Sequence, residues 1–222
     1  MGEWIQLDTA AGPARAWFAN PGKPVRGAVV VLQEIFGVNA HIRAVTDGFA
    51  HAGFAALAPA LFDPVQPGVE LGYGESGVAR GRELAAELGF EQAVQVASAA
   101  ASRLREAGHH PGVVGYCWGG SVAFLANTRL GLPSVSYYGA RTVPFLSESA
   151  RAPMLFHFGG RDASTPPEDV ARHRELQPAA TIHVYPEAGH AFNRDVDPAH
   201  FHAASAALAR SRTLEFLARH TS

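Results

Sequence analysis

Short runs of apolar residues recur along the chain, and longer polar or mixed segments separate them. The runs are bounded by Gly or Pro, and their apolar residues occupy successive positions rather than alternate ones. Continuous apolarity of this kind is typical of strands that are covered on both faces of a parallel sheet. It predicts buried strands at residues 26–33, 54–59, 112–117, 133–139, 153–160 and 181–186.

The segments between these runs favour helices. They are rich in Ala, Glu, Arg and Leu or place apolar residues on one stripe, and Asn39 and Gly53 can cap and end the first of them. Helices are therefore predicted over residues 39–53, 78–106 and 199–219. Alternating strands and helices predict an α/β fold with an open, mostly parallel sheet, right-handed crossovers and helices on both faces.

Two further segments complete the predicted layout. Residues 3–9 and 14–20 favour an antiparallel N-terminal hairpin at the sheet edge, and the Pro- and Gly-rich residues 60–79 favour a surface loop. The chain has 222 residues and shows no repeat, low-complexity tract or linker. We therefore expect a single domain over residues 1–222.

Composition narrows the function classes. A net charge of −2 gives no electrostatic footprint for nucleic acid, and no apolar run reaches the length of a membrane span. The N-terminal residues lack the basic and apolar regions of a signal peptide, and a single cysteine excludes an internal disulfide framework. We expect a cytoplasmic protein with a small-molecule partner, and neither nucleic acid nor a membrane.

That single cysteine lies at a strand-to-helix junction. Residues 115–119 read Gly-Tyr-Cys-Trp-Gly, which is the nucleophile-elbow pattern with Cys117 in place of serine. Such an elbow is a strained turn that needs glycine neighbours, and the following helix directs its positive end toward the sulfur and favours the thiolate. The alternative is a packed cysteine in a Gly-rich turn.

An acid and a histidine follow this cysteine in the order that elbow hydrolases use. Asp162 and His190 each come directly after a predicted strand, and ligands bind at the carboxyl ends of strands in open α/β sheets. The competing Asp169 fits the first turn of a helix, where residues 165–168 resemble a capping box with a proline at the first position. Asp195 and Asp197 follow the histidine, which is the wrong order.

Other polar residues carry weaker signals. Glu34 ends the first parallel strand, and from the residues alone a solvent-facing position is the better interpretation. His200 and His202 suggest a metal, but no nearby carboxylate or cysteine completes a ligand set, so we expect none.

Five segments in this order and spacing carry a family resemblance: "QEIFGVNAHIR", "GYCWGG", "SYYGA", "FHFGGRD" and "EAGHAFNRD". Together they resemble the dienelactone hydrolase (carboxymethylenebutenolidase) family of α/β hydrolases over roughly residues 3–219. The resemblance implies an α/β-hydrolase fold. It makes Cys117 the nucleophile, Asp162 and His190 the other triad members, and Glu34 a carboxylate that contacts the resting thiol and helps to deprotonate it.

The same resemblance implies the groups around the substrate. It assigns the oxyanion hole to the backbone N–H groups of Ile35 and Trp118, and it makes Arg194 the group that grips a substrate carboxylate. A second arginine would be Arg80 or Arg82, although the local match is poor because the family's aromatic residues are absent there. Tyr137 and Tyr138 match a tyrosine pair near the substrate.

We therefore expect a hydrolase for an enol-lactone or ester that bears a carboxylate, of the dienelactone to maleylacetate type in aromatic compound degradation, with no cofactor. The closest alternative is a general carboxylesterase or thioesterase, which needs the triad but neither arginine. A non-catalytic binding protein does not account for the Cys/Asp/His set. A thiol-redox role lacks a resolving cysteine.

Overall fold

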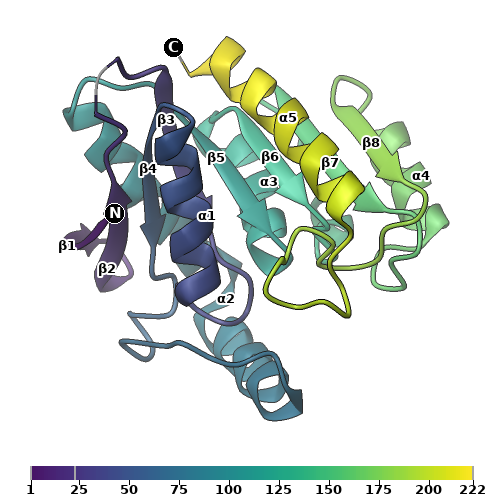
Figure 1. The fold of residues 1–222 in the computed structure, drawn as a ribbon, viewed down its shortest axis with the longest axis horizontal. Coiled ribbons are helices and arrows are strands. Elements are labelled where there is room, and N and C mark those ends of the chain that lie inside the picture. Colours follow the sequence, from purple (N-terminus) through teal and green to yellow (C-terminus); the bar gives the residue numbers. More distant parts are fainter. Residues whose placement is uncertain (1, 23, 222) are drawn as a thin grey trace.

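One mixed sheet of eight strands organises the molecule (Figure 1), in a computed structural model that describes residues 2–22 and 24–221. Its order is β1-β2-β4-β3-β5-β6-β7-β8; the neighbours from β4 to β8 are parallel, whereas β1 with β2 and β2 with β4 are antiparallel. The strands are β1 (Glu3–Thr9), β2 (Gly12–Ala19), β3 (Gly27–Leu32), β4 (Phe54–Pro59), β5 (Pro111–Tyr116), β6 (Ser134–Tyr137), β7 (Met154–Gly159) and β8 (Thr181–Tyr185). The predicted parallel sheet and the antiparallel hairpin at its edge are confirmed.

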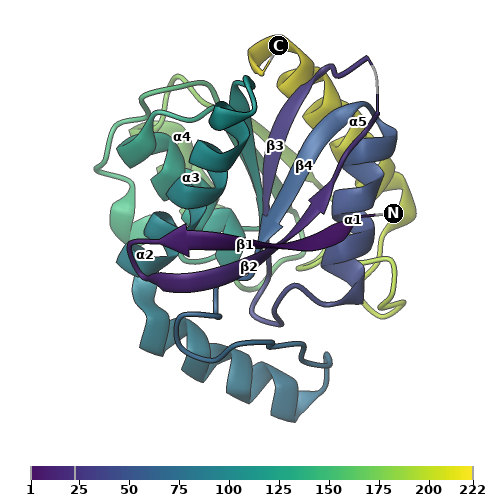
Figure 2. The same cartoon turned by 90° about the vertical axis from the view of Figure 1, so that its left-hand side faces the viewer.

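Helices cover both faces of the sheet (Figures 1 and 2). One face carries α1 (Ala40–His51) and α5 (Ala203–His220); the other carries α2 (Glu75–Glu106), α3 (Trp118–Leu130) and α4 (Pro167–Leu176). Side chains of β3 alternate between the two cores, Val30 toward α2 and α3 and Val29 toward α1 and α5. Each fully buried aliphatic side chain of this kind contributes about 1.5–3 kcal/mol to the stability of the fold.

Two local predictions are wrong. The predicted loop over residues 60–79 ends early, because α2 already begins at Glu75. Gly74, in an extended conformation, is the cap residue that precedes the helix. The predicted capping box before α4 does not form; Pro166 is the cap residue, and the Thr165 hydroxyl is buried without a partner among the described residues. Pro167 occupies the first helical position, where the predicted capping box would place Pro166.

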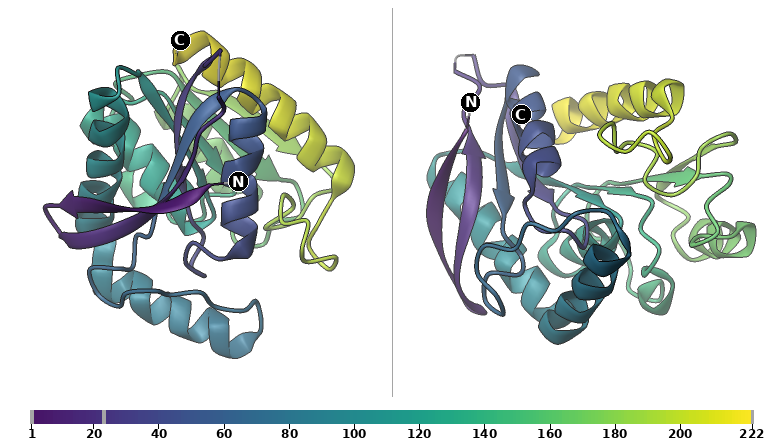
Figure 3. Two further views of the ribbon diagram at one scale, coloured as in Figure 1. Left: turned by 60° about the vertical axis from the view of Figure 1, so that its left-hand side comes forward. Right: turned by 60° about the horizontal axis from the view of Figure 1, so that its bottom comes forward.

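Helix α2 is bent, and the bend brings its first half to the site. Gly89 has φ of 70° inside the helix, a conformation that glycine adopts without a Cβ penalty. Figure 3 shows the half before this residue lying across the end of the sheet, at a steep angle to the second half. Gly81 packs so closely there that a Cβ would lie 2.2 Å from the Ile35 carbonyl oxygen. The first half of α2 therefore covers the loop that follows β3.

Candidate active site

The turn between β5 and α3 holds Cys117 in a strained conformation. Its φ is 53° and its ψ is −118°, which a non-glycine residue adopts only where the surrounding structure enforces it. The flanking glycines are required by space: a Cβ on Gly115 would lie 1.9 Å from the Gly119 oxygen, and one on Gly119 would lie 2.3 Å from the Gln33 oxygen. The predicted nucleophile elbow therefore forms at this position.

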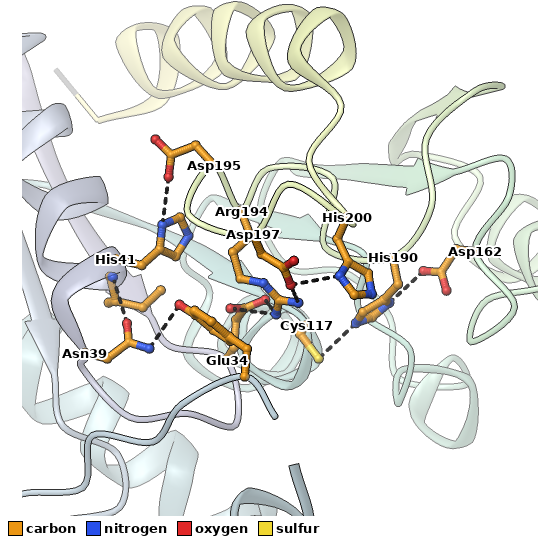
Figure 4. A network of polar contacts seen from close by, with 12 residues as sticks. Glu34, Asn39, His41, Cys117, Asp162, His190, Arg194, Asp195, Asp197 and His200 are labelled. Carbon is orange, nitrogen blue, oxygen red and sulfur yellow. Dashed lines mark hydrogen bonds and ion pairs between the residues drawn. The ribbon is translucent and has the colours of Figure 1, made fainter. Parts of the chain in front are cut away.

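The residues predicted as a triad meet in one hydrogen-bonded row (Figure 4). His190 Nε2 lies 3.2 Å from Cys117 Sγ, and His190 Nδ1 lies 2.8 Å from Asp162 Oδ2. The other oxygen of Asp162 accepts the backbone N–H of Ser164 at 2.8 Å, which fixes the carboxylate. Asp169 lies on α4, with its backbone oxygen 2.7 Å from His173 Nδ1, and takes no part in this row.

The surroundings of His190 favour its protonated form. Burial opposes protonation, but the hydrogen bonds with Asp162 and Cys117 outweigh it and raise the pKa of the imidazole to about 10. A base that is oriented by a carboxylate and contacts a thiol is the arrangement that nucleophilic cysteine catalysis needs.

Two backbone N–H groups are free to bind an oxyanion. Neither Ile35 nor Trp118 donates its backbone N–H to an acceptor among residues 2–22 and 24–221. The first follows β3, and the second starts α3 directly after the nucleophile. The Trp118 ring stacks on Phe62 with centroids 5.5 Å apart, which holds the start of the helix in place. Both N–H groups lie at the strand ends that carry Cys117.

A buried ionic cluster lies beside Cys117 (Figure 4). Arg194 is 6% exposed, and its Nη1 atom lies 3.4 and 3.5 Å from the two carboxylate oxygens of Glu34. Its Nη2 atom donates to Asp197 at 2.7 Å, and Asp197 also contacts His200. One cation between two carboxylates leaves the cluster with a formal excess of negative charge.

Glu34 differs from both expectations about it. It is 1% exposed, so it does not face solvent, and its carboxylate contacts Arg194 rather than the thiol. Within the described residues the hydrogen-bonding partner of Cys117 Sγ is His190. The physical reason is that a buried carboxylate needs a cationic partner, and the buried guanidinium supplies it.

The expected second arginine does not join the site. Arg80 donates to Glu83 at 2.9 Å and to Gln66 at 2.6 Å, and Arg82 is exposed on α2. The face of α2 that packs inward carries Gly81 and other small or aliphatic residues, without a cation.

The two tyrosines that follow one another at the end of β6, Tyr137 and Tyr138, lie in different environments. Tyr137 is buried, and its hydroxyl forms a hydrogen bond of 2.6 Å with the Thr213 hydroxyl of α5. This contact directs the Tyr137 hydroxyl toward α5. Tyr138 has φ of 41°, its ring meets the His190 ring edge-on at 5.1 Å, and its hydroxyl is buried without a partner among the described residues. Burial, followed by the charge of Glu34, raises the pKa of Tyr138 well above its usual value.

Tyr73 of this site escaped prediction. Tyr73 lies with its ring 4.3 Å from the Arg194 guanidinium carbon, and its hydroxyl accepts a hydrogen bond of 3.1 Å from Asn39. The one signal for Tyr73 is an aromatic residue between two glycines in a stretch otherwise typical of a surface loop.

Comparison with known proteins decides the family. The model of the dienelactone hydrolase family matches residues 14–221. The chain belongs to the dienelactone hydrolase family. It is 35% identical to carboxymethylenebutenolidase from Pseudomonas putida over 91% of this chain and 90% of that protein. It is 33% identical to carboxymethylenebutenolidase 1 from Cupriavidus pinatubonensis over 94% of this chain and 93% of that one.

Solved structures agree with this assignment. A Klebsiella pneumoniae structure that carries a provisional dienelactone hydrolase name superposes with a TM-score of 0.86 at 28% identity, over 99% of both chains. A dienelactone hydrolase-like promiscuous phosphotriesterase from metagenomic libraries superposes with a TM-score of 0.78 at 20% identity, over 100% of this chain and 99% of that one, which shows the shared fold. The protein is thus a hydrolase with the α/β-hydrolase fold. Among its described residues, none of the helices has the length and apolarity to cross a membrane.

Proposed function

We propose that this enzyme hydrolyses an enol-lactone or ester bearing a carboxylate, of the dienelactone to maleylacetate type, with Cys117 as nucleophile. The observation that carries the proposal is the continuous row from Sγ through the His190 imidazole to Asp162, at distances of 3.2 and 2.8 Å, on a strained elbow. Relatives named carboxymethylenebutenolidase at 35% identity support the same reaction class.

The first half of the reaction makes a thioester. The Cys117 thiolate adds to the lactone carbonyl carbon, and the negative oxygen is held by the N–H groups of Ile35 and Trp118. Collapse of this intermediate breaks the ring C–O bond, and the ring oxygen leaves as an enolate. His190, protonated near neutral pH because its pKa is raised, can supply the proton that the leaving group takes.

The second half releases the acid. Neutral His190, held by Asp162, removes a proton from water, and the hydroxide adds to the thioester carbonyl. Collapse expels the Cys117 sulfur and leaves a carboxylic acid on the product. An enolate departs readily, so a thiolate nucleophile suffices for this substrate class.

Arg194 supplies the recognition of the substrate carboxylate in this proposal. Its contacts with Glu34 are long, at 3.4 and 3.5 Å, so a substrate carboxylate with shorter charge-assisted bonds can replace them. The Glu34 carboxylate released from Arg194 is then the proposed acceptor for the Cys117 proton. Substrate binding then also activates the nucleophile.

The test is steady-state kinetics on carboxymethylenebutenolide, its neutral methyl ester and p-nitrophenyl acetate. Arg194→Ala should cost about 2 kcal/mol in transition-state stabilisation for the anionic lactone, a roughly 30-fold loss in kcat/KM, as expected for a lost ionic hydrogen bond. The neutral substrates should change little. Cys117→Ala should abolish turnover of all three, and substantial residual turnover would contradict the mechanism.

A general carboxylesterase or thioesterase is the second candidate, and one observation favours it. Arg80 is held by Glu83 and Gln66, so the second cation of the expected clamp is absent from the site. Equal losses for anionic and neutral substrates in Arg194→Ala would support this alternative and exclude the carboxylate clamp.

A further inference from the structure

The existing contacts of the Arg194 guanidinium determine where a further anion could bind to it. Nη1 faces Glu34 and Nη2 donates to Asp197, while Nε is buried without a partner among the described residues. One face of the guanidinium lies against the Tyr73 ring, 4.3 Å from its centroid. A buried N–H without an acceptor is costly, and an anion placed at this edge would satisfy it.

The Tyr73 ring lies against this cation, and its hydroxyl is held at the far end of the ring by Asn39. Its oxygen accepts a hydrogen bond of 3.1 Å from the Asn39 side-chain amide. The other end of that amide is also held, because it accepts the Ile42 backbone N–H at 3.2 Å as the cap of α1. Among the described residues no acceptor lies within hydrogen-bonding distance of the Tyr73 O–H group.

This hydroxyl remains a donor at the pH of catalysis. Burial is the largest influence, the Asn39 hydrogen bond opposes it, and the balance raises the pKa of Tyr73 to about 12. The charges of Glu34, Arg194 and Asp197 also act on the pKa of this hydroxyl. A neutral donor and a cation side by side match the two oxygens of a carboxylate.

We propose that Tyr73 is a specificity-determining residue, whose hydroxyl donates a hydrogen bond to the substrate carboxylate bound at Arg194. It takes the role of the second cation, which Arg80 and Arg82 do not supply. A single cation with a neutral donor, next to two carboxylates, selects a substrate with one carboxylate over a dianion. The inference rests on the proposed carboxylate-bearing substrate, and its test is separable from that of the reaction.

The experiment measures binding without turnover. Both proteins carry Cys117→Ala, and one of them also carries Tyr73→Phe. Calorimetry measures the Kd of each for carboxymethylenebutenolide and for its methyl ester. Tyr73→Phe keeps the ring on Arg194 and removes only the O–H donor. Tyr73→Phe should raise the Kd of the anion about tenfold, which is about 1.4 kcal/mol and the scale of a hydrogen bond to a charged group. The Kd of the methyl ester should not change.

Tyr185→Phe is the matched control, because that hydroxyl contacts His157 and Arg212 instead of the ionic cluster. It should leave both dissociation constants unchanged. An unchanged Kd for the anion in Tyr73→Phe, or equal losses for anion and ester, would overturn the inference. Turnover of p-nitrophenyl acetate by the enzyme that retains Cys117 tests the reaction separately, so the two proposals can fail independently.

Discussion

At the scale of single residues, the row from Cys117 to Asp162 depends on which carboxylate orients the histidine. Asp162 is buried and contacts His190 Nδ1 at 2.8 Å, so it fixes the tautomer that leaves Nε2 to face the sulfur. Asp169 comes seven residues later and is also acidic, but it lies half-buried in the first turn of α4. Sequence order and strand position predicted Asp162 as the acid, and Asp162 is the carboxylate that contacts His190.

This assignment predicts the effect of removing each charge. Asp162→Asn should lower kcat by several orders of magnitude, because the amide stabilises the wrong imidazole tautomer, and it should lower the pKa of His190 from its raised value of about 10. Steady-state kinetics and imidazole NMR titration measure the two effects. Asp169→Asn is the control and should behave as wild type; a larger loss there than in Asp162→Asn would show that the acid was misassigned.

At the scale of elements, the close approach of α3 to β3 positions Cys117. The start of α3 can pass the end of β3 only because Gly119 has no side chain there, with Leu32 and Gln33 oxygens in the way. Those obstacles are backbone atoms in the centre of the sheet, which cannot move without disturbing neighbouring strands. The elbow is therefore a property of two packed elements.

Gly119→Ala should destabilise the fold by about 1–3 kcal/mol through overpacking and should also reduce kcat, because Cys117 moves with the helix. Urea unfolding and kinetics test it. Gly48→Ala on α1 is the matched control, since its Cβ would approach only the end of Arg210 at 3.4 Å, and it should be neutral or slightly stabilising. Equal stability of the two variants would contradict the packing argument.

The parts of the site that sequence could predict are those with a local pattern. The elbow and the residues at strand ends follow from glycine spacing and strand order, and both were predicted. The contact between Arg194 and Glu34 was not, because it depends on how two loops far apart in the sequence fold against each other. Tyr73 was hidden for the same reason: its loop is pinned to residues 36–37 by a Leu71 to Phe36 backbone hydrogen bond and a Gly37–Glu70 bridge.

At the scale of the whole molecule, the triad contributes to the pH dependence of folding stability. A histidine has a pKa of about 6.5 in an unfolded chain, and folding raises that of His190 to about 10. The folded state therefore binds this proton more tightly than the unfolded state. The resulting stabilisation is complete below pH 6.5 and is lost as the pH rises toward 10.

His190→Asn should remove this contribution, so its difference in unfolding free energy from wild type should be largest near pH 6 and shrink steadily toward pH 10. Urea unfolding at a series of pH values measures that difference. His110→Asn, at an exposed histidine between α2 and β5, is the control and should show a constant difference. His157 should have the opposite effect on the pH dependence of stability. Burial lowers the pKa of His157 well below its usual value, so its contribution to stability is lost as the pH falls. A His190→Asn difference that grows with rising pH would mean that the imidazole is held neutral in the folded enzyme.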